Sequence, residues 1–295
     1  MESRSASAAL RRPLYIEGPR GPWTQVRDEV VRSGSALLVA MLDEWPGGGG
    51  RPGIDGRADD DGWSTDTGRN GPRLRRLLGG EWPRYAALTN EAIRRRFVAS
   101  RILLKEAAGA VLGTPAELLE LSVTPSGRPY LRGYGQVDIT LSHTEEILLV
   151  GITTRGVMGV DVEQADRTLV SGQAPPHICT PWEQEYLLSL PEAERGEALV
   201  RFWTLKEAYT KAIGQGLRFA FNGFCFGAED GLPRLLSADG VPRAAGAGEE
   251  WSFATHWVRG RHIAAVALYD SGTGGVMEPR RAVLDEAVCR MFGYE

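Results

Sequence analysis

Two long segments with helical periodicity, each set among short apolar runs of strand type, constrain the fold of this chain most strongly. The first, Thr89–Val111, begins with residues able to cap a helix and carries apolar side chains at helical spacing. The second, Glu197–Ile213, stops at Gly214. Before the first helix lies Ala36–Leu42, an apolar and partly β-branched run that predicts a buried strand.

Further short apolar runs predict more strands and one more helix. Arg155-Gly156 predicts a hairpin turn between two of these strands, and Thr180–Leu190, which begins with Thr-Pro, predicts a helix. The order of strand, long helix and strands occurs twice, so the sequence predicts an α+β fold of two similar halves that meet near residue 155. The remaining predicted strands are Val137–Leu141, Ile147–Thr153, Val157–Glu163, Phe219–Phe226, Trp251–Trp257 and Ile263–Tyr269.

The predicted boundaries give an N-terminal half at 1–155, a C-terminal half at 156–271, and a linker and C-terminal helix at 272–295. The linker contains the run Ser271–Gly275, and the helix is expected at Pro279–Phe292. The N-terminal half also holds a long loop, Pro46–Pro72, with nine glycines and three prolines. The run Asp59-Asp60-Asp61-Gly62 within it lacks an acid two residues earlier, which argues against an EF-hand calcium loop.

Composition excludes several classes of protein. The net charge is −4, so nothing in the overall charge favours nucleic acid as a partner. No run of 18 apolar residues occurs, so no membrane span is expected. The three cysteines are widely spaced and form no CxxC pair, which indicates reduced thiols in a cytoplasmic protein.

The basic residues are unevenly distributed. The segment Glu91–Lys105 carries five of them against one acid, which favours a phosphorylated small ligand. Only three lysines occur among the 34 basic residues, and two of them, Lys206 and Lys211, fall within one hexapeptide. This hints that those two positions need a compact ammonium and not a guanidinium.

A pair of carboxylates occurs in Gly159-Val160-Asp161-Val162-Glu163. On a strand, alternate residues share a face, so Asp161 and Glu163 point the same way with side chains that start about 7 Å apart. Two carboxylates in this arrangement can share one hard cation. By itself the pattern also fits a solvated strand face.

A polar stripe is predicted on the second long helix. Trp203, Glu207 and Lys211 lie at i, i+4 and i+8 and therefore share one side of the helix. A surface Glu–Lys pair would explain two of these residues, but Trp203 is costly to leave exposed on such a stripe. We therefore expect the stripe to border a pocket.

Two further motifs precede the carboxylate pair. Ser142-His143 ends an apolar strand, where the histidine either completes local hydrogen bonds or donates to a phosphate oxygen. Pro125-Ser126-Gly127-Arg128-Pro129-Tyr130 predicts a turn, and composition alone says nothing more about it.

Taken in order, GRPY, LSH, GVDVE and WTLKEAYTK resemble the surfactin-synthetase-activating type of 4'-phosphopantetheinyl transferase. The resemblance covers about Arg84–Tyr269. It implies a double-length, monomeric protein whose two halves form a pseudo-dimer around one active site. It also implies Mg²⁺-dependent transfer of phosphopantetheine from coenzyme A to a serine of an acyl or peptidyl carrier protein, with release of 3',5'-ADP.

The resemblance further implies residue roles. Asp161, Glu163 and Glu207 resemble metal ligands, and Glu207 is the candidate base for the carrier serine, either directly or through a metal-bound water. Lys211 and His143 resemble contacts to the coenzyme A diphosphate, where they would stabilise charge. The remaining coenzyme-binding residues that it implies are Gly127, Arg128, Pro129 and Tyr130 around the adenine, together with Ser142 and Lys206.

The basic helix predicts a site for the 3'-phosphate of coenzyme A. Its arginines do not all share one face, so they cannot all reach one phosphate. Arg96 and Arg101 are the candidates. Two other functions stay open at this level: a non-catalytic module that binds coenzyme A or a carrier protein, and a magnesium-dependent nucleotide hydrolase.

Overall fold

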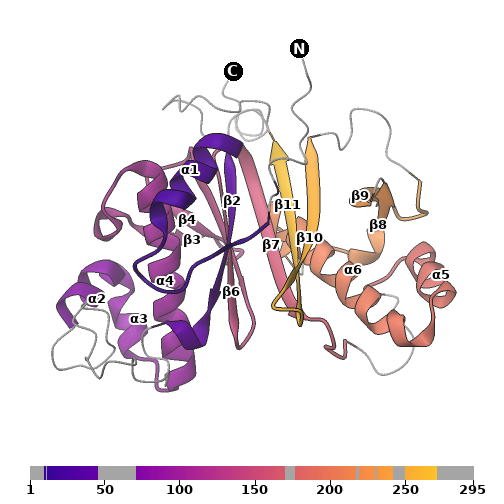
Figure 1. Cartoon of the computed structure of the whole chain (residues 1–295), viewed down its shortest axis with the longest axis horizontal. Helices are drawn as coiled ribbons and strands as arrows, with labels where there is room; N and C mark the ends of the chain where they lie inside the picture. Colours follow the sequence, from indigo (N-terminus) through magenta and orange to yellow (C-terminus); the bar gives the residue numbers. More distant parts are fainter. Residues whose placement is uncertain are drawn as a thin grey trace, which may run out of the picture.

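The computed structural model describes residues 10, 12–45, 71–169, 177–216, 219–229, 231–241 and 250–270 (Figure 1). Helices and strands are mixed along the chain. The helices are α1 (Trp23–Ser33), α2 (Gly71–Leu78), α3 (Trp82–Ala86), α4 (Glu91–Leu112), α5 (Pro181–Ser189) and α6 (Glu192–Ala212). The strands are β1 (Leu14–Tyr15), β2 (Ser35–Met41), β3 (Leu121–Val123), β4 (Pro129–Leu131), β5 (Asp138–His143), β6 (Ile147–Thr153), β7 (Gly156–Gln164), β8 (Phe224–Glu229), β9 (Leu232–Ser237), β10 (Trp251–Val258) and β11 (His262–Asp270).

The first half of the chain builds a four-stranded sheet in the order β1-β2-β6-β5. Helices α1 and α4 cover one face of it, and their apolar side chains share one buried cluster with alternate residues of β2 and β6. The start of α4 is fixed by Asn90, whose Oδ1 accepts a hydrogen bond from the Ile93 amide at 3.0 Å. The helix ends at Gly113, which adopts the left-handed conformation (φ 64°) that a C-terminal cap requires.

The second half builds a three-stranded sheet in the order β10-β11-β7, and the long helix α6 packs on one face of it. Aromatic side chains fill the space between α6, this sheet and the hairpin of β8 and β9. Tyr209 alone contacts five other rings, including Trp251 at 4.9 Å between centroids. Thr180 caps α5 through a reciprocal pair of hydrogen bonds with Glu183.

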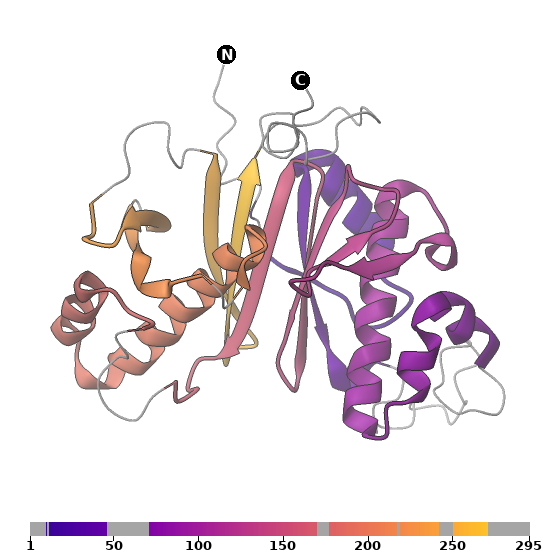
Figure 2. The ribbon, with the colours of Figure 1, turned by 180° about the vertical axis from the view of Figure 1, so that it is seen from behind.

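The two sheets face each other across a separate apolar cluster. Val39 of β2 and Leu149 of β6 pack there against Val160 and Val162 of β7 and Val266 of β11. The molecule therefore has four layers, with α1 and α4 on one outer side and α6 on the other, as Figures 1 and 2 show from opposite sides.

The two halves repeat one topology. In each, a strand is followed by a long helix and then by two antiparallel strands, and the last strand pairs with both the first strand and its own predecessor. The order β2-β6-β5 in one sheet thus corresponds to β7-β11-β10 in the other.

Most of the predicted elements are confirmed. The strand expected at Ala36–Leu42 is β2, and the helices expected at Thr89–Val111 and Glu197–Ile213 are α4 and α6, although α6 begins five residues earlier. The strand expected at Phe219–Phe226 instead begins with a 3₁₀ turn, Phe221–Gly223, and continues as β8.

The hairpin predicted at Arg155-Gly156 is wrong. Strands β6 and β7 flank this turn but belong to different sheets, because β6 pairs with β2 and β5 while β7 pairs with β11. Here the chain crosses from one sheet to the facing one. Thr153 and Thr154 stabilise the crossing, since both side chains donate hydrogen bonds to the Gly34 carbonyl.

Several predictions fall outside the described residues. These are the loop up to residue 70, with its Asp59-Asp60-Asp61-Gly62 run, and the linker and helix at 272–295. Among the residues that are described, none of the helices combines the length and the hydropathy needed to cross a lipid bilayer.

Candidate active site

Polar side chains predicted from separate motifs converge where β5, β7 and α6 meet. Asp161 of β7 is buried, and its Oδ1 accepts hydrogen bonds from Lys211 Nζ at 2.6 Å and from Ser142 Oγ at 2.8 Å. Lys211 Nζ also donates to Ser142 Oγ at 3.2 Å. Each of the three residues comes from a different element, so the cluster forms only when α6 and both sheets are packed together.

Gly159 allows α6 to approach β7 closely enough to form this cluster. A Cβ atom at this position would lie 1.9 Å from the Ala208 carbonyl oxygen and 2.5 Å from the Ala212 amide nitrogen. Both atoms belong to the backbone of α6, which cannot turn aside as a flexible side chain does. The glycine of the GVDVE motif is therefore required by packing.

The alternation predicted for β7 holds in the structure. Val160 and Val162 pack in the cluster between the sheets, while Asp161 and Glu163 lie on the side of α6, where both act electrostatically on Glu207. A solvated strand face does not describe this arrangement, because Asp161 is only 3% exposed.

Glu207 of α6 is 7% exposed, and the pKa of its carboxyl group is raised. Burial raises its pKa to about 7, and the neighbouring Asp161 carboxylate adds to the rise, while Lys211 opposes it. A carboxyl group with a pKa near neutrality can accept a proton at physiological pH.

Glu163 is held by a residue that the sequence motifs did not single out. Arg167, four residues further on, donates a hydrogen bond to the Glu163 carboxylate, and its guanidinium lies 6.0 Å from the centre of the Trp203 ring. Burial and the charge of Asp161 raise the pKa of Glu163, and Arg167 opposes the rise. The sequence feature that could have indicated this pair is an arginine four residues after the second acid of the GVDVE motif.

Two buried carboxylate oxygens, Asp161 Oδ2 and Glu207 Oε1, have no hydrogen-bond partner among the described residues. Unpartnered carboxylate oxygens suit a hard divalent cation, so Asp161 and Glu207 fit such an ion. Glu163 is paired with Arg167 instead. Within the described ranges, no three acidic, histidine or cysteine side chains are placed to hold a metal ion together, so the predicted set of three carboxylates is not assembled in this structure.

His143 ends β5 at the exposed edge of the cluster. Its pKa lies below the usual value because partial burial and the nearby cations Arg96 and Lys211 disfavour the charged form. The structure thus brings Arg96, one of the two arginines predicted to bind phosphate, into the same region as His143 and Lys211. Three basic groups from α4, β5 and α6 gather there.

Other basic residues of α4 have structural partners, which corrects part of the prediction. Arg101 forms a two-pronged ion pair with Glu81, with a shortest distance of 2.7 Å, and lies over the Phe97 ring. Lys105 is buried and donates to the Leu77 carbonyl. Both side chains attach α4 to the segment before it, so neither presents a free cation to a phosphate.

Lys206, predicted to bind coenzyme A, lies in the core instead. It is fully buried, and its ammonium donates to the Ile178 carbonyl at 2.8 Å, to the Phe221 carbonyl at 2.7 Å and to the Glu183 carboxylate. All three N–H groups are therefore used within the protein. The scarcity of lysine suggested that this position needs an ammonium, and the structure gives the reason: Lys206 forms a buried ion pair with Glu183. None of the sequence motifs pointed to Glu183.

The predicted turn around Gly127 joins β3 to β4. The amide of Gly127 donates to the Thr124 carbonyl at 2.8 Å, and Gly127 has a φ of 87°, a value that favours glycine. Tyr130 is exposed, Pro129 is half-buried, and the Arg128 side chain points into the protein, where it meets Asp138. Hydrogen bonds within the turn also use the Arg128 amide, which donates to Thr124 Oγ1, and the Arg128 carbonyl, which accepts from the Thr124 amide.

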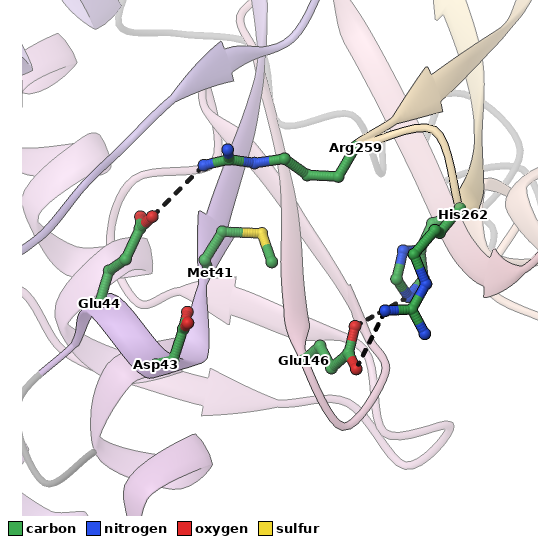
Figure 3. Close-up of a pocket in the computed structure, with 7 residues that line it drawn as sticks. Met41, Asp43, Glu44, Glu146, Arg259 and His262 are labelled. Atoms are coloured by element: carbon green, nitrogen blue, oxygen red, sulfur yellow. Dashed lines mark hydrogen bonds and ion pairs between the residues drawn. The ribbon is translucent and has the colours of Figure 1, made fainter. Parts of the chain in front are cut away.

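Two cavities lie apart from this cluster. One, of about 240 Å³, is lined by residues of both halves, and Figure 3 shows Arg259 reaching Glu44, with the pair 3.3 Å apart. In the same cavity Glu146 lies 3.8 Å from the buried His262. The other, of about 430 Å³, is walled by α5, α6 and β8 and includes the ring of Tyr186. Neither is lined by any of the predicted site residues.

Part of this cluster lies in a stretch of the chain that matches a known family. Residues 157–267 match the profile of the 4'-phosphopantetheinyl transferase superfamily. This range includes Asp161, Glu163, Glu207 and Lys211, whereas Ser142, His143 and the Gly127 turn precede it.

Individual relatives carry the same description. The 4'-phosphopantetheinyl transferase HetI of Nostoc sp. is 31% identical over 127 residues, which cover 42% of this chain and 54% of HetI. The phosphopantetheinyl transferase of Thraustochytrium sp. is 27% identical over 208 residues, or 65% of this chain and 70% of that protein. The 4'-phosphopantetheinyl transferase psf-1 of Bacillus pumilus is 26% identical over 147 residues, or 49% and 61%. This chain spans about half the length of several curated relatives that it matches, HetI among them.

Proposed function

We propose that this protein is a 4'-phosphopantetheinyl transferase, which moves phosphopantetheine from coenzyme A to a serine of an apo acyl or peptidyl carrier protein. The observation that carries the proposal is the cluster of the buried Asp161 and Glu207 with the half-buried Lys211. Its members come from a strand and a helix of the range that matches this superfamily. In phosphoryl transfer, carboxylates hold the metal ion and a lysine neutralises charge on the phosphates, and this cluster contains both kinds of group.

In the proposed reaction, the serine hydroxyl of the carrier attacks the phosphorus that bears the pantetheine arm. A new phosphorus–oxygen bond forms to serine, and the bond to 3',5'-ADP breaks. Glu207, whose carboxyl is buried beside Asp161, takes the proton of the hydroxyl. Lys211, with His143 beside it, stabilises the negative charge on the diphosphate and on the leaving group.

Asp161 and Glu207 would hold a Mg²⁺ ion, with Glu163 as a third ligand once Arg167 releases it. A bound Mg²⁺ ion supplies neutralisation of phosphate charge and polarisation of the phosphoryl oxygen. Before any ion binds, Lys211 holds Asp161 and keeps its buried charge compensated.

Coenzyme A would bind along the edge of this cluster. We propose that the backbone of Gly127, Arg128, Pro129 and Tyr130 contacts the adenine, that Ser142 and His143 contact phosphate oxygens, and that Arg96 contributes positive charge. We propose a carrier protein as the macromolecular partner, with no nucleic acid or membrane involved. A cytoplasmic monomer is the expected form.

The repeated topology supports a finer proposal about architecture. The halves 1–155 and 156–271 would form a pseudo-dimer around one site, as in the surfactin-synthetase-activating type of this enzyme, with 272–295 as an added segment. The site draws Ser142 and His143 from one half and Asp161, Glu207 and Lys211 from the other.

A mass-shift assay tests the function. The protein is incubated with coenzyme A, magnesium and a panel of apo acyl and peptidyl carriers, and each carrier is weighed by mass spectrometry. Gain of one phosphopantetheine on the carrier serine, with release of 3',5'-ADP, supports the proposal. Binding of coenzyme A without transfer would indicate a non-catalytic module, and cleavage of coenzyme A without carrier modification would indicate a hydrolase.

A further inference from the structure

The Arg128 side chain joins three elements that belong to both halves of the protein. One terminal nitrogen of its guanidinium donates to the backbone carbonyl of Lys211 in α6. The other donates to the Asp138 carboxylate of β5 and, at 2.8 Å, to the Met158 carbonyl of β7. The side chain is only 15% exposed, so these hydrogen bonds are shielded from water.

Asp138 closes this network. Its Oδ2 also accepts a hydrogen bond from the Met158 amide at 2.7 Å, so Arg128 and Asp138 together occupy both backbone polar groups of Met158. Burial raises the pKa of Asp138, and the Arg128 guanidinium opposes that rise. The pair thus links the first strand of the β5–β6 hairpin to β7 at the point where the two sheets meet.

The contact with Lys211 falls at the end of α6. The Lys211 carbonyl is among the last of the helix and also accepts a hydrogen bond from the Gly214 amide at 3.1 Å. A cation is favourable at this end of a helix because the carbonyl dipoles point toward it. Arg128 therefore holds the main chain of Lys211, whose side chain reaches Asp161 and Ser142.

The spread of the three acceptors suits an arginine. Two different nitrogens of one planar group reach acceptors on α6, β5 and β7, and a lysine has only one nitrogen with which to do so. Arg128 also belongs to the β3–β4 turn, where its amide donates to Thr124 Oγ1 at 3.1 Å. The turn and the end of α6 are therefore mechanically joined.

We propose that Arg128 is a positioning residue that sets Lys211 against the reacting phosphate, while its side chain makes no contact with coenzyme A. This inference rests on the proposed transferase function. A displacement of about 1 Å at a catalytic group typically costs about 100-fold in rate, so loss of this link should lower kcat markedly.

The first test is a kinetic double-mutant cycle. Arg128→Met should lower kcat by about 10- to 100-fold and change the KM for coenzyme A by less than about threefold, with Arg128→Lys intermediate. In a Lys211→Ala background, Arg128→Met should cause little further loss, because the residue through which it acts is gone. Arg132→Met is the control, since the Arg132 side chain is 62% exposed and its 3.6 Å ion pair is with Glu120, which is itself 63% exposed. Losses that multiply in the double variant, or a change in KM alone, would overturn the proposal.

The second test does not depend on turnover. The chain has three lysines, so selective ¹³C,¹⁵N-lysine labelling gives three side-chain signals, and Lys211→Arg identifies the one from Lys211. Arg128→Met should shift that signal in the free protein, and Arg132→Met should not. A shift in a protein that fails to modify any carrier would retain the positioning role and reject the transferase function. An unchanged Lys211 signal would reject the positioning role, whether or not transfer occurs.

Discussion

The close contact between β7 and α6 makes a sharp prediction for Gly159→Ala. The added methyl group would meet the Ala208 carbonyl oxygen at 1.9 Å, where ordinary van der Waals contact begins at 3.4 Å. The helix must therefore withdraw by about 1.5 Å, or β7 must bend by the same amount. Overpacking of this kind typically costs about 1–3 kcal/mol in the free energy of unfolding.

The functional cost should exceed the loss of stability. Glu207 and Lys211 flank the contact on α6, and both face Asp161 on the strand that the new methyl group would push away. A shift of about 1 Å between catalytic groups costs about 100-fold in rate, so transfer to the carrier should fall at least that far while the protein still folds.

The assay compares two alanine substitutions that concern the same helix. Gly196 lies in α6 with nothing within 4 Å of its added Cβ, so Gly196→Ala should preserve transfer and raise the free energy of unfolding by up to about 1 kcal/mol. Urea denaturation and carrier mass-shift kinetics are measured for both variants. If Gly159→Ala keeps wild-type transfer within threefold and unfolds like Gly196→Ala, α6 is not pressed against β7 as described.

Three other predictions concern buried charges. Asp161→Asn should reduce transfer by about 100-fold or more with little change in circular dichroism, and near wild-type transfer at millimolar magnesium would contradict the role given to Asp161. Lys206→Met should lower the free energy of unfolding, measured in urea, by about 3–5 kcal/mol because it leaves Glu183 buried without its cation. The double variant Lys206→Met/Glu183→Leu should recover part of that loss. If Lys206→Met leaves the free energy of unfolding unchanged, the buried ion pair is contradicted. With metal removed by a chelator, Glu207 should stay protonated in the folded protein up to a pH of about 7, whereas in the unfolded chain it loses its proton near pH 4.5. Between these two pH values the folded state binds more protons, so the free energy of unfolding should fall as the pH rises. Glu207→Gln should remove up to about 3 kcal/mol of that fall, and identical pH profiles for the two proteins would refute the shift.

Local patterns were sufficient for the long helices and for the faces of the strands. Asn90 lies directly before α4, which it caps, and Gly214 lies just beyond the end of α6, so the start of α4 and the end of α6 could be predicted. The two-residue alternation placed Asp161 and Glu163 on one side of β7 for the same reason. These features depend on neighbours in the chain.

Strand pairing could not be predicted in this way. The turn at Arg155-Gly156 has the composition of a hairpin, yet β7 pairs with β11 about 100 residues later. Every residue of β6 is buried, because β6 has neighbouring strands on both edges and clusters of apolar side chains on both faces. A uniformly apolar run gives no signal for which strand comes next to it.

The role of each basic residue depends on contacts that are equally distant in sequence. Lys206 and Lys211 lie five residues apart on one helix, yet one is sealed in the core by Glu183 while the other reaches Asp161 beside Ser142. Helical spacing predicts that the two side chains leave α6 on different sides. Which side faces the core depends on how the neighbouring strands and helices pack against α6. The close approach at Gly159 and the contact from Arg128 to the end of α6 supply that position. The close packing within the second half and the contact from Arg128 in the first half therefore place Lys211 beside Asp161.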